Sequence, residues 1–280
     1  MKNTIKYIFC FFLACFISCY SCYSQEKSRY KCAYQFDFLS DTITMSYFRK
    51  EIYIVQIGDK ITKGFTYQKF YLDSLKKASP DLAMQMSKAL VKEGLEAWKS
   101  TGDMSHLNNS SFHLGAFTSD LYKDYKKNEI RVKENNLHSF NYKDELKAQD
   151  WEILNDTTTI LGYYCQKAQC HWRGRDWEAW FTSEIPISEG PWKFYGLPGL
   201  ITKLHDTKNH YSFELTGFQE IRETIDTKIK NSQKIERKEY LRMQFGRKGE
   251  LITEAEMAKV GLSHEPNKRN YDYIERDYKE

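Results

Sequence analysis

The sequence carries little excess charge of either sign. Its 280 residues contain 42 Lys and Arg against 38 Asp and Glu, a formal net charge of +4. A nucleic-acid-binding protein typically shows a strong basic excess or a basic stripe, so this balance argues against nucleic acid as a partner. With 41% hydrophobic and 15% aromatic residues, the chain is too apolar for a disordered or low-complexity protein. It is also long enough to bury a sizeable core.

Familiar catalytic and cofactor motifs are missing. The sequence has no His-Glu-x-x-His, no Gly-x-Ser-x-Gly and no phosphate-binding glycine-rich loop, and its one Cys-x-x-Cys, Cys19 to Cys22, lies in the N-terminal apolar region. We therefore predict a non-enzymatic protein with no catalytic residues, no metal and no cofactor. Because catalytic triads need no fixed spacing, a hydrolase with an unrecognised site remains an alternative.

Long apolar runs are confined to the N-terminal region. Two lysines precede an apolar stretch over 7–22, and residues 22–24 supply small side chains where a signal peptidase reads. The stretch is shorter than the roughly 20 residues of a membrane-spanning helix. We expect a signal peptide over 1–24, with a lipoprotein signal at Cys19 or an uncleaved anchor as alternatives. The mature chain would keep 40 basic and 38 acidic groups and no transmembrane span, and would lie in the periplasm, at the outer membrane or outside the cell.

Three cysteines would remain after removal of the signal peptide. The exported compartment permits disulfides. Cys165 and Cys170 fall on one expected strand, where ~3.3 Å per residue places them roughly 16 Å apart, beyond the ~7 Å limit for a bridge. Cys32 is free to pair with either one, and an unpaired, buried set is equally compatible with the sequence.

Most of the chain has the pattern of antiparallel strands. Short runs of β-branched and aromatic residues are separated by turn residues. Turns of a few residues, such as 58–60 and 206–209, join antiparallel neighbours, because parallel strands need crossovers of a dozen residues or more. The expected strands are 30–38, 50–57, 61–70, 130–133, 137–142, 158–172, 176–182, 199–205 and 210–218.

Helices are expected to be few. Ser79 is a good N-cap, and Pro80 suits the first helical position. Apolar residues then recur at helical spacing, which predicts a helix over 80–99 as an insertion into a single domain over 25–280. The remaining expectations are a loop over 100–127 and a partly helical tail over 230–280, with helices at 234–243 and after a capping box at 253–256.

A distinct loop runs through residues 186–199. It holds three of the five prolines and three glycines, interleaved with aromatic residues, a composition that favours a rigid, shaped loop. Its end begins the hexapeptide Gly196-Leu197-Pro198-Gly199-Leu200-Ile201, which resembles the signature that names the GLPGLI family of exported bacterial proteins. The flanking stretches 160–168, 173–182 and 185–194 also resemble that family.

The family resemblance implies a fold more clearly than a function. It implies an exported protein, and no activity or catalytic residue is settled for the family. The chain is also similar to the bowl-like N-terminal domain of a type II peptide:N-glycosidase, in which the bowl is not the catalytic part. This similarity implies a mainly β fold: a curved antiparallel sheet, shaped as a bowl or half-barrel, with a few α-helices.

Aromatic and basic residues near the signature are the candidate ligand contacts. Aromatic faces in a shallow basin suit stacking on sugars or apolar ligands, and arginines at a turn grip carboxylate or phosphate. The candidates are Trp180, Trp192, Phe194, Tyr195, Arg173 and Arg175. The alternatives are a core role for the aromatic rings and a solvated turn for the arginines. For Gly196 to Ile201 we favour a structural role over recognition.

Two further constellations have weaker chemical interpretations. His205 and His210 flank a turn, and with Cys170 and His171 they would give a tetrahedral metal set; surface histidines are the alternative. Asp176 and Glu178 lie two apart on one strand, at ~6.6 Å, which falls within the range for paired glycosidase carboxylates. The solvated face of an ordinary sheet gives the same pattern.

These observations support three hypotheses about function. The leading one is a non-catalytic protein of the bacterial envelope that holds an apolar, peptide or glycan ligand in the concave sheet. The second is a protein-interaction module for outer-membrane or cell-surface machinery. The third is the hydrolase with an unrecognised site.

Overall fold

A computed structural model describes residues 26–41, 46–101, 119–135, 139–243 and 273–278. The expected signal peptide and the expected capping box at 253–256 lie outside these residues. None of the described helices is both long enough and apolar enough to cross a membrane.

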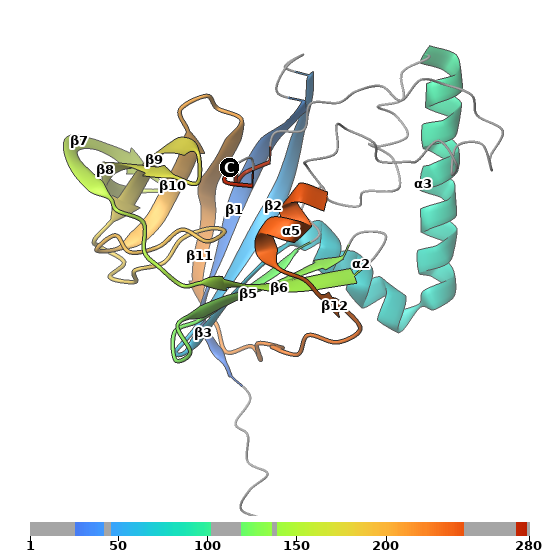
Figure 1. Cartoon of the computed structure of the whole chain (residues 1–280), viewed down its shortest axis with the longest axis horizontal. Coiled ribbons are helices and arrows are strands. Elements are labelled where there is room, and N and C mark those ends of the chain that lie inside the picture. Colours follow the sequence, from blue (N-terminus) through green and yellow to red (C-terminus); the bar gives the residue numbers. More distant parts are fainter. Residues whose placement is uncertain (1–25, 42–45, 102–118, 136–138, 244–272, 279–280) are drawn as a thin grey trace, which may run out of the picture.

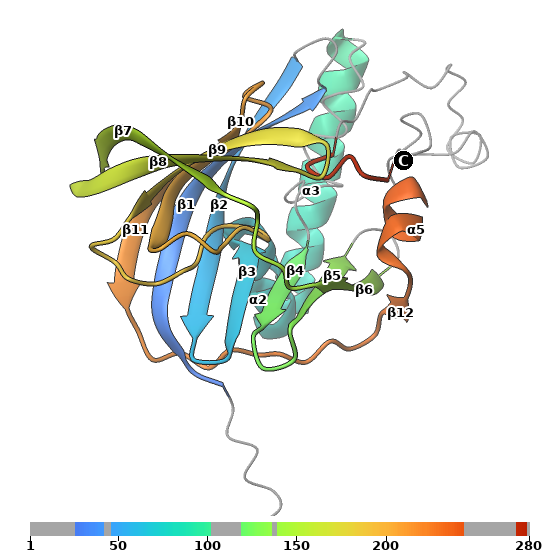
Figure 2. The same cartoon turned by 60° about the vertical axis from the view of Figure 1, so that its left-hand side comes forward.

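One sheet of twelve strands organises the described chain (Figures 1 and 2). Its order is β12-β6-β5-β4-β3-β2-β1-β11-β10-β9-β8-β7, and all pairs are antiparallel except β12 with β6. The predicted mainly β, antiparallel fold is confirmed. The strands are β1 Ser28–Asp41, β2 Ser46–Gly58, β3 Ile61–Thr66, β4 Asp120–Asp124, β5 Glu129–Asn135, β6 Ser139–Glu145, β7 Glu152–Ile160, β8 Tyr163–Trp172, β9 Arg175–Thr182, β10 Leu200–Asp206, β11 Tyr211–Glu220 and β12 Gln233–Lys234.

The sheet is open but curls so that side chains from near its two ends come into contact. Asp144 lies on β6, close to one end of the strand order, and Arg173 lies in the turn between β8 and β9, close to the other end. The Arg173 guanidinium nevertheless donates to the Asp144 carboxylate at 2.8 Å. The sheet therefore forms a bowl with an inner, concave face (Figure 2).

The inner face is lined by alternate residues of the central strands. Along β1, Cys32, Tyr34 and Phe36 are fully buried, while the residues between them are only partly buried. Phe36 stacks on Phe213 of β11 with ring centroids 4.2 Å apart, and the two residues are also register partners. This alternation with a period of two is what the sequence pattern predicted for 30–38.

Two elements differ from the prediction in the segment before β5. The strand expected over 61–70 ends at Thr66, and helix α2 Tyr67–Ala78 follows it. The predicted loop over 100–127 contains strand β4, whose five residues Asp120–Asp124 are all buried. The sequence pattern did not predict β4 as a buried strand, because it contains charged residues. These charges are tolerated in the interior because they are paired: Asp120 with Lys69 of α2, and Lys123 with Glu189.

The other differences concern breaks and lengths. The expected strand over 158–172 is divided into β7 and β8 by a turn in which Leu161 and Gly162 have φ of 50° and 84°. The helix expected over 80–99 is present as α3 Pro80–Thr101. The helix expected over 234–243 is only the short α5 Arg237–Leu241, because Lys234 belongs to strand β12. Helix α2 packs on β2 and β3, and α3 packs on α2 (Figure 1).

Candidate functional site

The loop of residues 183–199 joins β9 to β10 and fills the bowl. We call it the plug loop. Its Trp192, Phe194 and Leu197 are at most 1% exposed and belong to the main hydrophobic core. The Phe194 ring lies 4.8 Å from Trp172 and 4.6 Å from Trp177, measured between centroids. The concave face is thus occupied by the chain itself.

A buried ion pair fixes the plug loop to the opposite side of the bowl. Lys123 of β4 is fully buried and donates to the Glu189 carboxylate at 2.7 Å. The same ammonium group donates to the carbonyls of Gly190 and Phe194 at 3.1 and 2.8 Å. Glu189 also accepts a hydrogen bond from Thr62 of β3. Because five strands separate β4 from β9 in the sheet order, this contact spans the whole concavity.

The predicted ligand contacts of the plug loop have different exposures. Trp192 and Phe194 are buried, so the expectation that they face a ligand is at odds with their position, because neither ring is accessible while the loop stays in place. Tyr195 is half-buried and packs edge-on against Tyr125 at 5.9 Å. The Tyr195 amide donates to the side-chain oxygen of Gln149 at 3.1 Å, and the Trp151 indole nitrogen donates to the Tyr195 carbonyl at 2.9 Å.

The hexapeptide Gly196 to Ile201 leads from the plug loop into β10. Leu197, Leu200 and Ile201 are at most 1% exposed. A Cβ added to Gly199 would press against the carbonyl oxygen of Thr182, inside contact distance. These positions support the structural role that the sequence favoured.

The predicted arginines and Trp180 are separated by the fold. Arg175 is 3% exposed, donates to Asp206 at 2.8 Å and also binds the Tyr273 carbonyl. It is therefore not the solvated turn residue considered above. Arg173 is mostly buried and paired with Asp144. Trp180 is half-buried, with the Lys167 ammonium 5.8 Å from its ring centroid.

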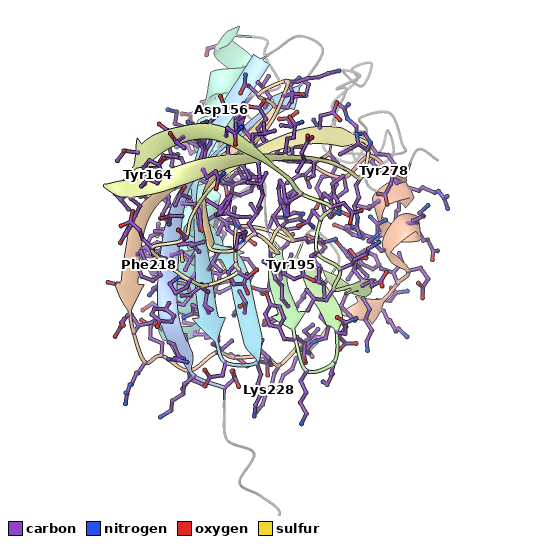
Figure 3. The ribbon with its side chains drawn as sticks, turned by 90° about the vertical axis from the view of Figure 1, so that its left-hand side faces the viewer. Asp156, Tyr164, Tyr195, Phe218, Lys228 and Tyr278 are labelled. Atoms are coloured by element: carbon purple, nitrogen blue, oxygen red, sulfur yellow. The ribbon has the colours of Figure 1, made fainter. Side chains whose placement is uncertain are left out.

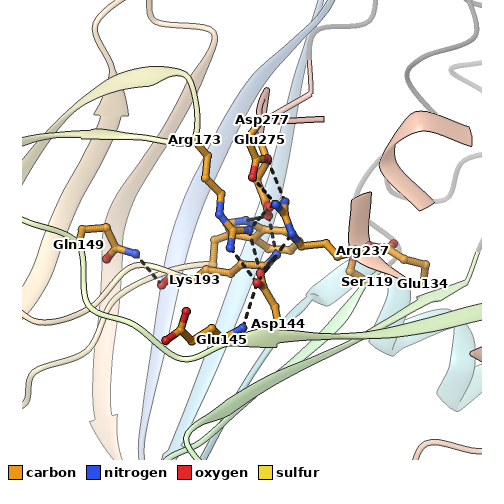
Figure 4. Close-up of polar contacts among 11 residues, drawn as sticks. Ser119, Glu134, Asp144, Glu145, Gln149, Arg173, Lys193, Arg237, Glu275 and Asp277 are labelled. Atoms are coloured by element: carbon orange, nitrogen blue, oxygen red, sulfur yellow. Dashed lines mark hydrogen bonds and ion pairs between the residues drawn. The ribbon is translucent and has the colours of Figure 1, made fainter. Parts of the chain in front are cut away.

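A buried ionic cluster lies at the mouth of the bowl, where side chains from near the two ends of the sheet come into contact (Figure 4). Lys193 of the plug loop is fully buried between Asp144 at 2.8 Å and Glu275 at 2.6 Å. Arg173 contacts both of these carboxylates, and Arg237 of α5 lies 2.6 Å from Glu275. Glu275 is itself fully buried.

Both carboxyl groups of the cluster are held in their ionised form. Burial alone would raise the pKa of Asp144, but Lys193 and Arg173 outweigh it and hold this pKa well below the usual value. The pKa of Glu275 is lowered in the same way, because Lys193, Arg173 and Arg237 together outweigh burial. A carboxylate held in the ionised form binds neighbouring cations and has no proton to donate.

An open cleft of about 260 Å³ adjoins the ionic cluster. Its walls come from the segment after β6, from the end of β8 and from the plug loop. Asp144, Lys193 and Arg173 of the ionic cluster also line it, and the lining residue Gln149 is buried. The exposed lining residues are Glu145, Lys147, Ala148, Asp150 and His171, and Trp172 and Arg173 are half-buried. We call this space the mouth cleft.

The mouth cleft presents balanced charge and one aromatic wall. Three acidic residues (Asp144, Glu145, Asp150) face three basic ones (Lys147, Arg173, Lys193). The Arg173 guanidinium lies over the Trp172 ring, 4.6 Å from the ring centroid. Of the predicted ligand contacts, only Arg173 lines this cleft. His171, which the sequence analysis singled out as a metal ligand, lines it as well. The sequence analysis did not connect the other lining residues, because they come from segments that are distant in the chain. The only signal for Lys193 was its place between Trp192 and Phe194.

The histidines and carboxylates singled out in the sequence form ordinary pairs. His171 bonds Asp176 at 2.6 Å, and Glu178 pairs with Lys167 at 3.0 Å and with His205 at 3.3 Å. Burial lowers the pKa of His205. Within the described ranges, no group of three or more His, Cys, Asp or Glu residues is placed to hold a metal ion.

The three cysteines of the expected mature chain are free and buried. Cys165 and Cys170 lie on the same strand, β8, as predicted. Burial raises the pKa of the Cys32 and Cys170 thiols to about 12, so both are protonated at neutral pH. Because the thiolate is the nucleophile, neither is suited to nucleophilic catalysis.

Comparisons with known proteins leave the function open. A family model described as a protein of unknown function (Porph_ging) matches residues 173–203, which include the plug loop. This is a different family from GLPGLI, so membership of GLPGLI stays a prediction. No curated protein matches the sequence.

Solved structures with a similar fold include two of PNGF-II, in the C2 and P21 space groups. Each is 17% identical, with a TM-score of 0.47, and the match covers 77% of this chain. It covers 32% and 33% of the respective PNGF-II chains, so this chain spans about a third of their length.

Proposed function

We propose that the protein is an exported, non-catalytic envelope protein that binds a glycan in the mouth cleft. Among the ligand classes expected from the sequence, a glycan fits best. A neutral ligand rich in hydroxyl groups can donate to the exposed carboxylates of Glu145 and Asp150 and accept from the exposed ammonium group of Lys147. The half-buried Trp172 supplies an aromatic wall of the kind that stacks on a sugar ring.

The observation that carries the proposal is the contrast between the two concave spaces. The interior of the bowl is filled by Trp192, Phe194 and Leu197, whereas the mouth cleft of about 260 Å³ is open and lined by polar groups. This volume suits one sugar unit of a longer chain, because binding pockets for larger organic ligands start at about 300 Å³.

The absence of catalysis is part of the proposal. Its support is that the buried carboxylates at the cleft are committed to ion pairs: Asp144 with Lys193 and Arg173, and Glu275 with Lys193. A glycosidase acid needs a raised pKa, and the pKa of Asp144 is lowered.

Titration with a panel of neutral oligosaccharides, followed by amide NMR shifts, tests the proposal. We expect millimolar or tighter binding, with shifts around Gln149, Asp150 and Trp172. Asp150→Ala should weaken binding at least about tenfold, equivalent to the loss of one or two hydrogen bonds. Asp156→Ala on β7 is the matched control, since Asp156 is equally exposed but lies outside the cleft. Equal effects of the two variants, or no shifts in the cleft, would contradict the proposal.

A second candidate function is a protein-interaction module, and strand β7 favours it. β7 is the last strand of the sheet order, so one of its edges has no strand partner within the described residues. It contains no proline or lysine, the residues that commonly protect edges. Ile153, Leu161 and Tyr164 in the β7–β8 hairpin are 46–61% exposed (Figure 3 labels Tyr164).

The chemistry of β7 indicates the kind of partner that this second function would need. Its ionisable residues are Glu152 and Asp156, both acidic and exposed. An extended segment with lysines at alternate positions would add as a further strand and match this charge. An NMR titration with an alternating Val-Lys peptide should shift β7 amides, and Asp156→Lys should abolish the effect. Unchanged β7 amides would exclude this second function.

A further inference from the structure

The segment Tyr273 to Tyr278 of this chain lies in the mouth of the bowl. We call it the tail segment. Ile274 and Glu275 are fully buried, and Tyr273 and Tyr278 are at most 9% exposed. None of these residues belongs to a strand of the sheet. The contacts that hold the tail segment therefore come from side chains and from isolated backbone hydrogen bonds.

The backbone of the tail segment is recognised at two points around one turn. Arg175 donates to the Tyr273 carbonyl through Nε at 3.2 Å and Nη2 at 2.9 Å. The amide of Arg276 donates to the Arg173 carbonyl at 2.9 Å. Arg173 in the β8–β9 turn and Arg175 at the start of β9 thus bind the backbone of the segment on both sides of Glu275.

Three cations from separate elements converge on Glu275. They are Arg173 from the β8–β9 turn, Lys193 from the plug loop and Arg237 from α5. The Trp192 indole nitrogen donates to the same carboxylate at 3.3 Å. Arg237 also pairs with Asp277. Figure 4 shows both tail carboxylates directed at these side chains.

The charges on the two sides are complementary. Apart from the tail segment, the cluster has three cations and the single carboxylate of Asp144, an excess of two positive charges. The tail segment contributes two carboxylates to the cluster, Glu275 and Asp277, and its one cation, Arg276, is half-buried. Removing them would leave buried, unbalanced cations, which is costly in a protein interior.

We infer that the mouth of the bowl is a binding site for a carboxylate-bearing peptide and that the chain's own residues 273–278 occupy it. Part of the receptor side reaches solvent, because Arg173, which also lines the mouth cleft, keeps 16% of its side chain exposed, and Arg237 keeps 11%. Capture of a charged segment by converging arginines together with backbone hydrogen bonds is a recurring mode of peptide recognition. The inference is independent of glycan binding, which can fail without affecting it.

Binding in trans tests the inference. The receptor is the full chain carrying Glu275→Ala and Asp277→Ala, and the probe is a fluorescein-labelled peptide with the sequence of residues 271–280. We expect this variant to bind the peptide at least about tenfold more tightly than the wild-type chain, whose site is filled by a tail of high effective concentration. Binding should weaken in high salt, which screens exposed charges during association.

The matched control is a probe with glutamine and asparagine in place of Glu275 and Asp277. We expect this neutral peptide not to bind. The inference is overturned if the folded variant binds neither peptide, or binds both equally well.

Should the variant not fold, native-state hydrogen exchange of the unmodified chain gives the decision. A docked peptide dissociates locally, so the Arg276 amide should exchange at least tenfold faster than the amides of β1, with little acceleration by denaturant. If the Arg276 amide exchanges at the same rate as β1 and with the same dependence on denaturant, the segment is an integral part of the core and the inference is wrong.

Discussion

At the scale of single residues, the pair of Lys123 and Glu189 is the anchor on which the plug loop depends. The Lys123 side chain is fully buried and that of Glu189 is 3% exposed. Breaking a buried pair by removing one partner leaves an uncompensated charge and typically costs about 3–5 kcal/mol. We expect Glu189→Ala to lower the free energy of unfolding by about that amount, measured by urea denaturation.

The control for this prediction is an exposed ion pair of similar length. Arg29 and Asp59 are 3.1 Å apart, with side chains 63% and 65% exposed. Exposed pairs contribute about 0–1 kcal/mol, so Asp59→Ala should change stability little. Equal costs for the two variants would mean that the plug loop does not depend on Lys123.

A second prediction at this scale concerns pH and Glu134 of β5. Its carboxyl accepts from Ser119 at 2.6 Å, but burial dominates and raises its pKa from 4.5 to about 7. Between these two values the folded state keeps a proton that the unfolded state has lost, so stability falls as pH rises. Glu134→Gln should remove this loss. At pH 8 the variant should be more stable than the wild type by about 2–3 kcal/mol, whereas near pH 4 the two should be equal.

Comparing the wild type with the Glu134→Gln variant separates the contribution of Glu134 to the pH dependence of stability from that of other titrating groups. His205, whose pKa is lowered, acts in the opposite direction between its folded and unfolded values, but it is present in both chains. The lowered pKa values of Asp144 and Glu275 contribute stability that is lost only as the pH falls below about 4.5. Urea denaturation at pH 4, 6 and 8 measures the difference, and a difference that does not change with pH would refute the assignment to Glu134.

At the scale of elements, the entry into β10 makes a specific demand on glycine. A Cβ at position 199 would collide with the backbone of Thr182, and backbone atoms cannot rotate away. Gly217 in β11 is a matched control, because its nearest neighbour would be the Ala33 Cβ at 3.8 Å. We expect Gly199→Ala to cost at least about 2 kcal/mol and Gly217→Ala to be nearly neutral by thermal and urea denaturation. Similar stabilities would show that the hexapeptide has no structural role.

The elements that could be predicted are those whose burial follows a simple period. β1 alternates between buried and partly buried positions over 31–38, and α3 begins at the predicted Pro80. The elements that were missed depend on distant partners. Polar β4 is buried because Lys69 and Glu189 pair with its charges, and α2 begins with Tyr67 and Phe70, which continue the aromatic pattern of β3 in the sequence.

At the scale of the whole molecule, the bowl was predictable from the family resemblance, but its contents were not. The aromatic residues of the plug loop suit a ligand site and a core equally well, because both environments favour large apolar rings. The curl of the sheet decides between them. It brings Lys123 across the concavity to the loop and leaves Trp192 only 1% exposed.

The mouth cleft could not be predicted for a related reason. Asp144, Arg173 and Lys193 belong to three segments that become neighbours only because a twelve-stranded sheet curls. A short motif does not encode such a contact. Of these three residues only Arg173 was a candidate in the sequence, because a turn with charged residues is visible locally.

The central claim is that the bowl is closed by the chain itself and that a ligand binds at its mouth. The most direct test is to follow the tryptophan indole NMR signals while a neutral oligosaccharide that binds is added. We expect the signal of Trp172, at the cleft, to shift, while the signals of the buried Trp177 and Trp192 stay unchanged. Shifts of Trp177 and Trp192 with an unmoved Trp172 would mean that the ligand enters the bowl, and would contradict the account.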